Sequence, residues 1–167
     1  MPEEETIIAE KLKFNGIFDM KDFYAFLYDV MVSMGYDVQE DHYKQKELQA
    51  GNQLEISWTC DKNVDDYTKF VIKVNYFIVG LKTVEVQKGD VKVSSNKGDI
   101  EMKFKAVLRT DYEGRWEAQP FLKIVKKLYE NYLYRSSYMQ WKKKISEELN
   151  QLHNEAKAFF HLQRISS

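Results

Sequence analysis

Between residues 53 and 110, apolar and polar side chains alternate with a period of two, and this pattern constrains the fold more than any other feature of the chain. Such alternation is typical of β-strands that bury one face and expose the other. The side chains that we expect to point inward are Leu54, Ile56, Trp58, Cys60, Phe70, Ile72, Val74, Tyr76, Ile78, Ile100, Met102, Phe104, Ala106 and Leu108.

The opposite side of residues 70–79 also carries apolar side chains, at Val71, Phe77 and Val79, which predicts that this strand is covered on both faces. Turn residues at 88–90 and 96–99 divide the remaining chain, because glycine supplies positive φ and aspartate closes the turn with its own side chain. We therefore expect an antiparallel meander of about five or six strands.

An additional short strand is expected before the meander, with Ile8, Leu12 and Phe14 inward and a turn at Asn15-Gly16. A helix is predicted over 20–34, because large apolar residues recur there at spacings of three and four. Asp19 is placed to cap this helix and Gly35 to end it.

The C-terminal part predicts helices. Pro120 suits the first turn of a helix, and we expect Phe121, Val125, Leu128 and Tyr132 to line its inner face. A second apolar stripe runs through Tyr138, Trp141, Ile145, Leu149, Leu152, Ala156 and Phe159, with a spacing close to that of a coiled-coil seam.

The two stripes are out of phase, because a step of six residues separates Tyr132 from Tyr138. Such a step is a rotation of about 120° out of register in an α-helix. Ser137 and Gln140 match a capping box, so a new helix is predicted to start near 135–137.

These elements predict an α+β fold, with an antiparallel sheet packed against one N-terminal helix and one or two long C-terminal helices. We expect a single domain over 1–167, in which 1–114 supply the strand, helix and sheet and 115–167 form a basic helical segment. In the order of its elements the chain resembles the helix-grip arrangement of START-like lipid-binding domains. That resemblance implies a cavity between the sheet and the terminal helix, and it includes no sequence motif.

Charge is unevenly distributed although its total is balanced. Residues 1–114 carry a net charge of −6 and residues 115–167 a net charge of +5. Such a division can be satisfied within the chain, between copies of it or by an acidic partner. The single cysteine, Cys60, fits a reducing compartment, and the acidic start does not resemble a secretory signal, so we expect a cytoplasmic protein. The most apolar run is too short to span a bilayer.

The sequence contains no pattern that indicates catalysis or a cofactor. Residues 61–66 begin like a calcium loop, but Asp66 stands where glycine is needed and Ile72 where glutamate is needed. The three histidines and Cys60 are not at zinc-ligand spacing, and no phosphate-binding glycine loop occurs. We therefore expect a protein that is not an enzyme and has neither a metal nor a cofactor.

Three functions fit these features. The first is an assembly module that binds a second copy or a protein partner through the seam of Tyr138, Trp141, Ile145, Leu149, Leu152 and Phe159. The second is a carrier of a small apolar ligand, with Trp58, Tyr76 and Phe104 facing a cavity. The third is nucleic-acid or membrane-surface binding through a basic patch of Arg135, Lys142, Lys143 and Lys144 beside aromatic rings. The balanced total charge argues against nucleic acid.

Overall fold

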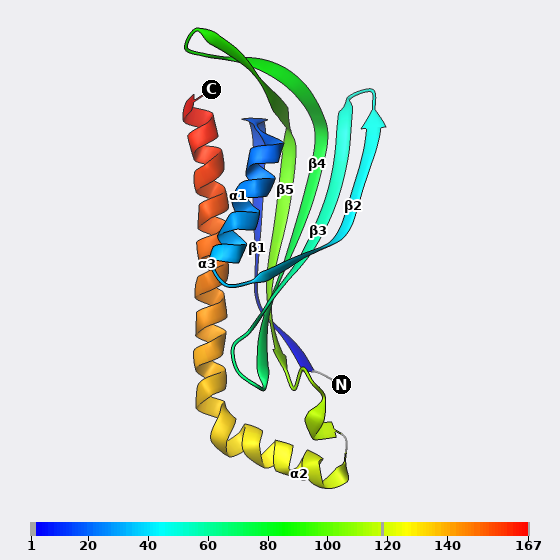
Figure 1. Cartoon of the computed structure of the whole chain (residues 1–167), viewed down its shortest axis with the longest axis vertical. Helices are drawn as coiled ribbons and strands as arrows, with labels where there is room; N and C mark the ends of the chain where they lie inside the picture. Colours follow the sequence, from blue (N-terminus) through cyan, green and yellow to red (C-terminus); the bar gives the residue numbers. More distant parts are fainter. Residues whose placement is uncertain (1–2, 118, 167) are drawn as a thin grey trace.

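The computed structural model describes residues 3–117 and 119–166 and has an α+β fold built on one five-stranded antiparallel sheet (Figure 1). The strands are β1 (Glu3–Phe18), β2 (Asp37–Leu48), β3 (Gly51–Asn63), β4 (Thr68–Lys88) and β5 (Val91–Thr110), in the order β1-β5-β4-β3-β2. The helices are α1 (Met20–Ser33), the 3-10 turn η1 (Arg115–Glu117), α2 (Pro120–Tyr129), the π-helical turn η2 (Glu130–Tyr134) and α3 (Arg135–Ser166). The predicted fold class is confirmed.

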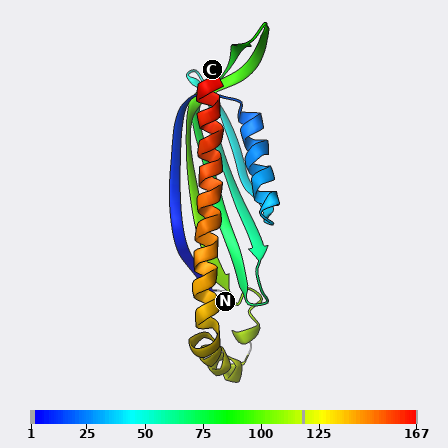
Figure 2. The ribbon, with the colours of Figure 1, turned by 90° about the vertical axis from the view of Figure 1, so that its left-hand side faces the viewer.

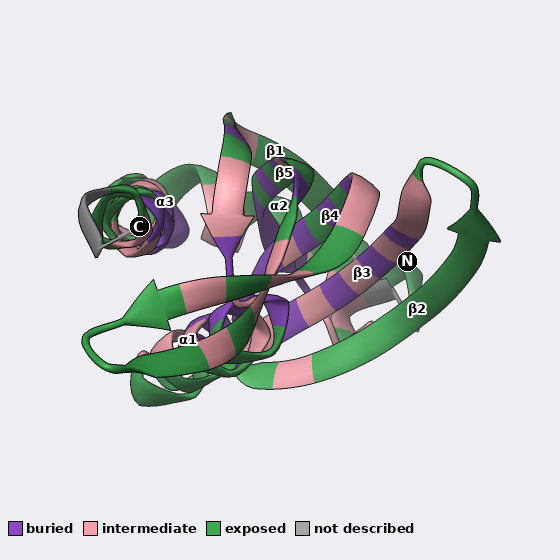
Figure 3. Ribbon diagram, turned by 90° about the horizontal axis from the view of Figure 1, so that it is seen from above, coloured by how far each residue is buried: buried purple, intermediate pink, exposed green. Residues whose placement is uncertain are grey.

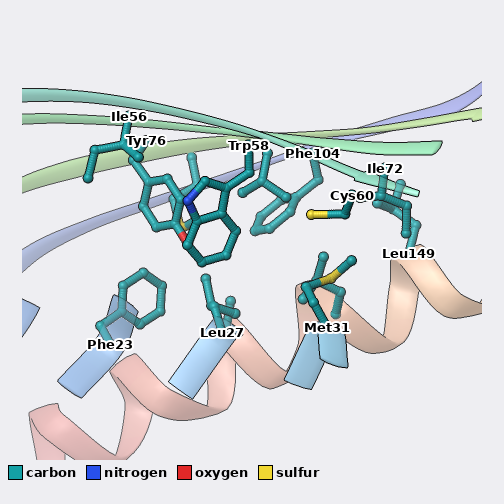
Figure 4. Close-up of a cluster of buried hydrophobic side chains, with 14 of the residues drawn as sticks. Phe23, Leu27, Met31, Ile56, Trp58, Cys60, Ile72, Tyr76, Phe104 and Leu149 are labelled. Atoms are coloured by element: carbon teal, nitrogen blue, oxygen red, sulfur yellow. The ribbon is translucent and has the colours of Figure 1, made fainter. Parts of the chain in front are cut away.

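Both α1 and the long α3 cover the same face of the sheet, which we call the inner face (Figures 1 and 2). The fourteen side chains expected to point inward from β3, β4 and β5 are all buried. Figure 4 shows Trp58, Tyr76 and Phe104 of the sheet above Phe23, Leu27 and Met31 of α1. Period-two alternation therefore identified the core of the sheet correctly.

The helix α1 also agrees with its prediction. Its buried residues Met20, Phe23, Leu27 and Met31 follow one helical face. Asp19 caps the helix, because its side chain accepts a hydrogen bond from the backbone N–H of Asp22 at 2.9 Å.

The strand β2 was not predicted, and Figure 3 shows why, since almost the whole strand is exposed. It lies at the edge of the sheet and pairs only with β3 among the described strands. A strand without a buried face has no apolar alternation by which it could be recognised. Its many charged residues and the bulge between Glu40 and His42 are features that protect an exposed edge from further pairing.

Two predicted turns are wrong. Gly16 lies inside β1, which continues to Phe18, and Gly98 lies inside β5 opposite Gly16. A Cβ atom at Gly98 would lie 3.2 Å from the Cα of Leu81, so glycine there allows close approach of neighbouring strands. The predicted turn at 88–90 is correct, and it joins β4 and β5 into one long hairpin. The sheet therefore has five strands.

The apolar stripe of α3 packs within the chain. Ile145, Leu149 and Leu152 are fully buried against the sheet. Polar contacts fix the same helix, because Lys62 of β3 lies 2.8 Å from the Glu148 carboxylate and Tyr36 donates to it at 2.5 Å. The helix is therefore anchored to β3 by both packing and charge.

Candidate association surface

The apolar face of α2 points mainly away from the protein, since three of the four residues predicted to line its inner side are exposed and only Val125 is half-buried. Phe121 is 70% exposed and Tyr132 is 79% exposed, and Leu128 is also exposed. The six large apolar side chains exposed between residues 121 and 139 are Phe121, Ile124, Leu128, Tyr132, Leu133 and Met139. We call these six residues the outward face. Helical periodicity predicted an amphipathic helix correctly, but it cannot say which side of the helix meets the protein.

The other side of α2 packs on an aromatic cluster. The Trp116 and Tyr129 rings are stacked, with centroids 5.7 Å apart and planes 14° apart. Tyr67 meets Tyr129 and Tyr134 edge to face at 5.6 and 5.0 Å. The hydroxyl of Tyr67 also donates to Glu130. These rings cover the inner side of α2, so its remaining apolar residues are left outside.

A buried ion pair also holds α2. Lys126 is 7% exposed, and its Nζ lies 3.6 Å from Asp111 Oδ2 and 3.5 Å from Glu3 Oε1. Asp111 is itself buried and has a left-handed backbone, with φ of 50°. A lysine inside and a phenylalanine outside is the reverse of ordinary helix packing, so this orientation gains no stability from burial of the outward face.

The turn between α2 and α3 explains the break in apolar phase. The segment η2 is a single π-helical turn, and α3 begins directly after it at Arg135. A π turn rotates the following helix relative to the preceding one. The phase break was therefore predicted correctly, and α3 begins within the predicted range of 135–137. Ser137 does not cap the new helix, because helical structure continues through that residue.

A surface groove of about 730 Å³ adjoins the outward face. One wall consists of Glu3, Glu4 and Glu5 of β1. The other wall includes Tyr132 and Met139, which belong to the outward face. An apolar surface thus continues into a groove with an acidic edge.

The rim of the outward face is basic. Lys123, Lys127 and Arg135 are exposed and form no ion pair with any residue that the structure describes. The predicted basic patch is partly neutralised, since Lys142 pairs with Glu5 at 2.8 Å and Lys143 with Glu147 at 3.9 Å.

Lys144 lies over the Trp141 ring, 5.7 Å from its centroid. Glu148, which stands four residues after Lys144 on the same helix, contacts Lys62. The four residues of the predicted basic patch therefore do not form one free cationic surface.

The predicted seam does not form an open surface. Ile145, Leu149 and Leu152 are buried in the core, and Tyr138, Trp141 and Phe159 are partly buried against it. Phe159 packs on the N-terminal helix, for example. The seam is buried because α3 lies along the apolar inner face of the sheet.

The three residues expected to line a ligand cavity lie in the core. Trp58, Tyr76 and Phe104 are buried, and the Trp58 and Tyr76 rings are in edge contact at 5.1 Å. None of the three lines the 730 Å³ groove. These rings pack on each other and on α1, and none of them lines the pocket of about 450 Å³ that Met20, Tyr24 and Ile56 help to form between α1 and the sheet.

In the part of the chain that the structure describes, no group of three or more His, Cys, Asp or Glu side chains is arranged to hold a metal ion. Among the same residues, no helix has the length and apolar character needed to cross a bilayer. Comparison with protein-family models and with curated proteins gives no match to this chain. Its function must therefore be inferred from its own surfaces.

Proposed function

We propose that this protein is a non-enzymatic assembly module, and that a second copy of the chain docks on the outward face. The observation that carries the proposal is the orientation of α2, which buries Lys126 and exposes Phe121, Ile124 and Leu128. Six of the thirteen large apolar side chains that the structure describes as exposed fall between residues 121 and 139. Concentrated apolar exposure of this kind marks interaction surfaces in soluble proteins.

Charge complementarity supports a second copy as the occupant. The basic rim of Lys123, Lys127 and Arg135 lies beside a groove that Glu4 and Glu5 also line. Each of these carboxylates has one cationic partner within the chain, Arg109 for Glu4 and Lys142 for Glu5, and has acceptor sites left for a second cation. A two-fold axis at the groove would place the basic rim of each copy against the acidic wall of the other. Such an arrangement would also satisfy the opposite net charges of residues 1–114 and 115–167.

The experiment is native mass spectrometry combined with sedimentation velocity over a range of protein concentrations. Wild-type protein is expected to form a dimer of the 19.9 kDa chain. The variant I124S/L128S should be monomeric with unchanged helicity, because both side chains are already exposed. The matched control is L162S, which replaces another exposed apolar residue of the C-terminal segment and should remain dimeric.

A wild-type monomer at every concentration would overturn self-association, and so would a dimer that survives I124S/L128S. The carrier hypothesis predicts instead a monomer that retains a small apolar molecule, and it would require the core around Trp58 to open. The buried thiol of Cys60 supports a reducing compartment such as the cytoplasm as the place of assembly.

A further inference from the structure

The outer face of the sheet, which points away from α1 and α3, carries a group of four lysines. In the strand register, Lys73 of β4 lies directly opposite Lys105 of β5. Lys103 of β5 lies directly opposite Lys11 of β1. Directly opposed residues project on the same side of a sheet, with Cβ atoms about 5 Å apart. The four side chains therefore form one compact cluster, which we call the lysine cluster.

Among the described residues, no carboxylate lies within ion-pair distance of the lysine cluster, although Glu101 occupies the next outward position on β5 after Lys103. Two other cations on the outer face have partners, since Lys69 pairs with Asp61 at 3.0 Å and Arg109 pairs with Glu4. Lys13 lies 3.6 Å from Glu101. The four lysines of the cluster form no ion pair with any residue that the structure describes. Like charges placed directly opposite destabilise a sheet. In the lysine cluster two such pairs lie side by side, and this concentration of positive charge favours an anionic ligand.

The neighbours of the cluster are suited to a phosphate-bearing strand with exposed bases. Asn75 lies opposite Lys103 and Ser57 lies opposite Asn75, so amide and hydroxyl groups continue the row across the sheet. Phe77 follows two residues after Asn75 on the same face and is 44% exposed. It lies between Glu55 of β3 and Glu101 of β5 in the strand register, so the phosphates are held at the lysine cluster and only a base reaches Phe77. The apolar residues Val71, Phe77 and Val79 predicted that residues 70–79 of β4 are covered on the outer face as well. Only the start of this segment is covered, since Val71 is fully buried whereas Phe77 is exposed.

We infer that the outer face of the sheet binds single-stranded nucleic acid, with the lysine cluster on the phosphates and Phe77 stacked on a base. Proteins that bind single strands combine cationic side chains along the backbone with aromatic side chains on which bases stack. A sheet face can present both, because alternate residues of neighbouring strands come together on it. The inference does not depend on the proposed self-association, which uses a different surface.

A membrane surface fits the outer face less well. Interfacial binding buries several apolar side chains among the lipid head groups. On the outer face of β3, β4 and β5, Phe77 is the only large apolar side chain that the structure describes as exposed, apart from Val91 at the tip of the hairpin. The total charge of −1 argues against nucleic acid for the chain as a whole, but charges interact over only about 10 Å at ordinary salt, so the local lysine cluster governs contact with phosphates.

The test is fluorescence anisotropy with labelled oligo-dT and oligo-U of about 16 nucleotides, a length that one single-strand binding module covers. The variant K73Q/K103Q/K105Q should lose at least tenfold in affinity. The slope of log Kd against log salt should fall by about 2, because each phosphate contact contributes about 0.7 for single strands. The control K88Q/K92Q/K157Q removes the same charge from other exposed lysines and should bind as the wild type does.

F77S provides a second, independent readout. Loss of one stacked base should weaken binding about tenfold while the salt slope stays unchanged. No binding at low salt, or an equal loss in both triple lysine variants, would overturn the inference. Binding to vesicles of phosphatidylserine and phosphatidylcholine without binding to either oligonucleotide would also overturn it and would indicate a lipid surface. The oligomeric mass of K73Q/K103Q/K105Q should match that of the wild type, which separates this test from that of the proposed function.

Discussion

Replacing Leu149 with alanine should destabilise the protein by about 3 kcal/mol, because this residue is fully buried between α3 and the sheet. Full burial of a leucine side chain contributes about 2 kcal/mol from removal of apolar surface from water. The cavity left by truncation adds to that loss, and buried Leu→Ala changes usually cost between about 2 and 5 kcal/mol. The denaturant concentration at the midpoint of unfolding should fall, whereas the slope of the free energy of unfolding against denaturant concentration should stay unchanged.

The assay is urea unfolding followed by circular dichroism at two protein concentrations, with native mass spectrometry on the same samples. The control is L162A, because Leu162 lies on the same helix but is 65% exposed, and its loss should be within about 0.5 kcal/mol. If L149A unfolds like the wild type but has a smaller oligomeric mass, the stripe on α3 joins two chains. That result would refute the packing argument and restore the seam as the association surface.

Three further predictions concern buried or shifted ionisable groups. Burial raises the pKa of Cys60 to about 12, so the native protein should not react with a thiol reagent at mildly alkaline pH. Fast reaction of the folded protein, before it unfolds, would contradict this prediction. K126M should lower the free energy of unfolding by about 3 kcal/mol, because it leaves Asp111 buried without its lysine. K126M/D111N should lower the free energy of unfolding by less. Equal losses of stability in urea unfolding would speak against a coupled pair. Burial, with a hydrogen bond to Glu40, raises the pKa of Tyr24 to about 12 from its ordinary 10.0, which favours the neutral phenol in the folded state. The contribution of that phenol to stability should be constant below pH 10 and decline between pH 10 and 12, so a difference between wild type and Y24F that grows over that interval would contradict the assignment.

Inward-facing residues of β3, β4 and β5 were predictable because one buried face imposes a period of two on the sequence. The helix α1 was predictable for the same reason with a period of 3.6, together with its cap at Asp19. Predictions failed where a segment has no buried face, as in β2, or where glycine serves close approach and not a turn, as at Gly98.

The direction in which an amphipathic face points could not be predicted either. Both α2 and α3 have an apolar stripe, yet α3 turns its stripe toward the sheet and α2 turns its stripe outward. The difference lies in what each helix meets. An apolar sheet face receives Leu149, whereas an aromatic cluster and the buried Asp111 receive the other side of α2.

The sequence by itself determined the α+β class, the identity of the core strands and the opposite charges of the two parts of the chain, because periodicity and charge are local properties. Only the tertiary structure decided which surfaces remain free. The outward orientation of Phe121 depends on contacts of α2 with Tyr67 and Asp111, which are distant in sequence. The lysine cluster likewise depends on strand register, which places Lys11 opposite Lys103 and Lys73 opposite Lys105. Register is fixed by pairing between distant segments, so no local pattern reveals it.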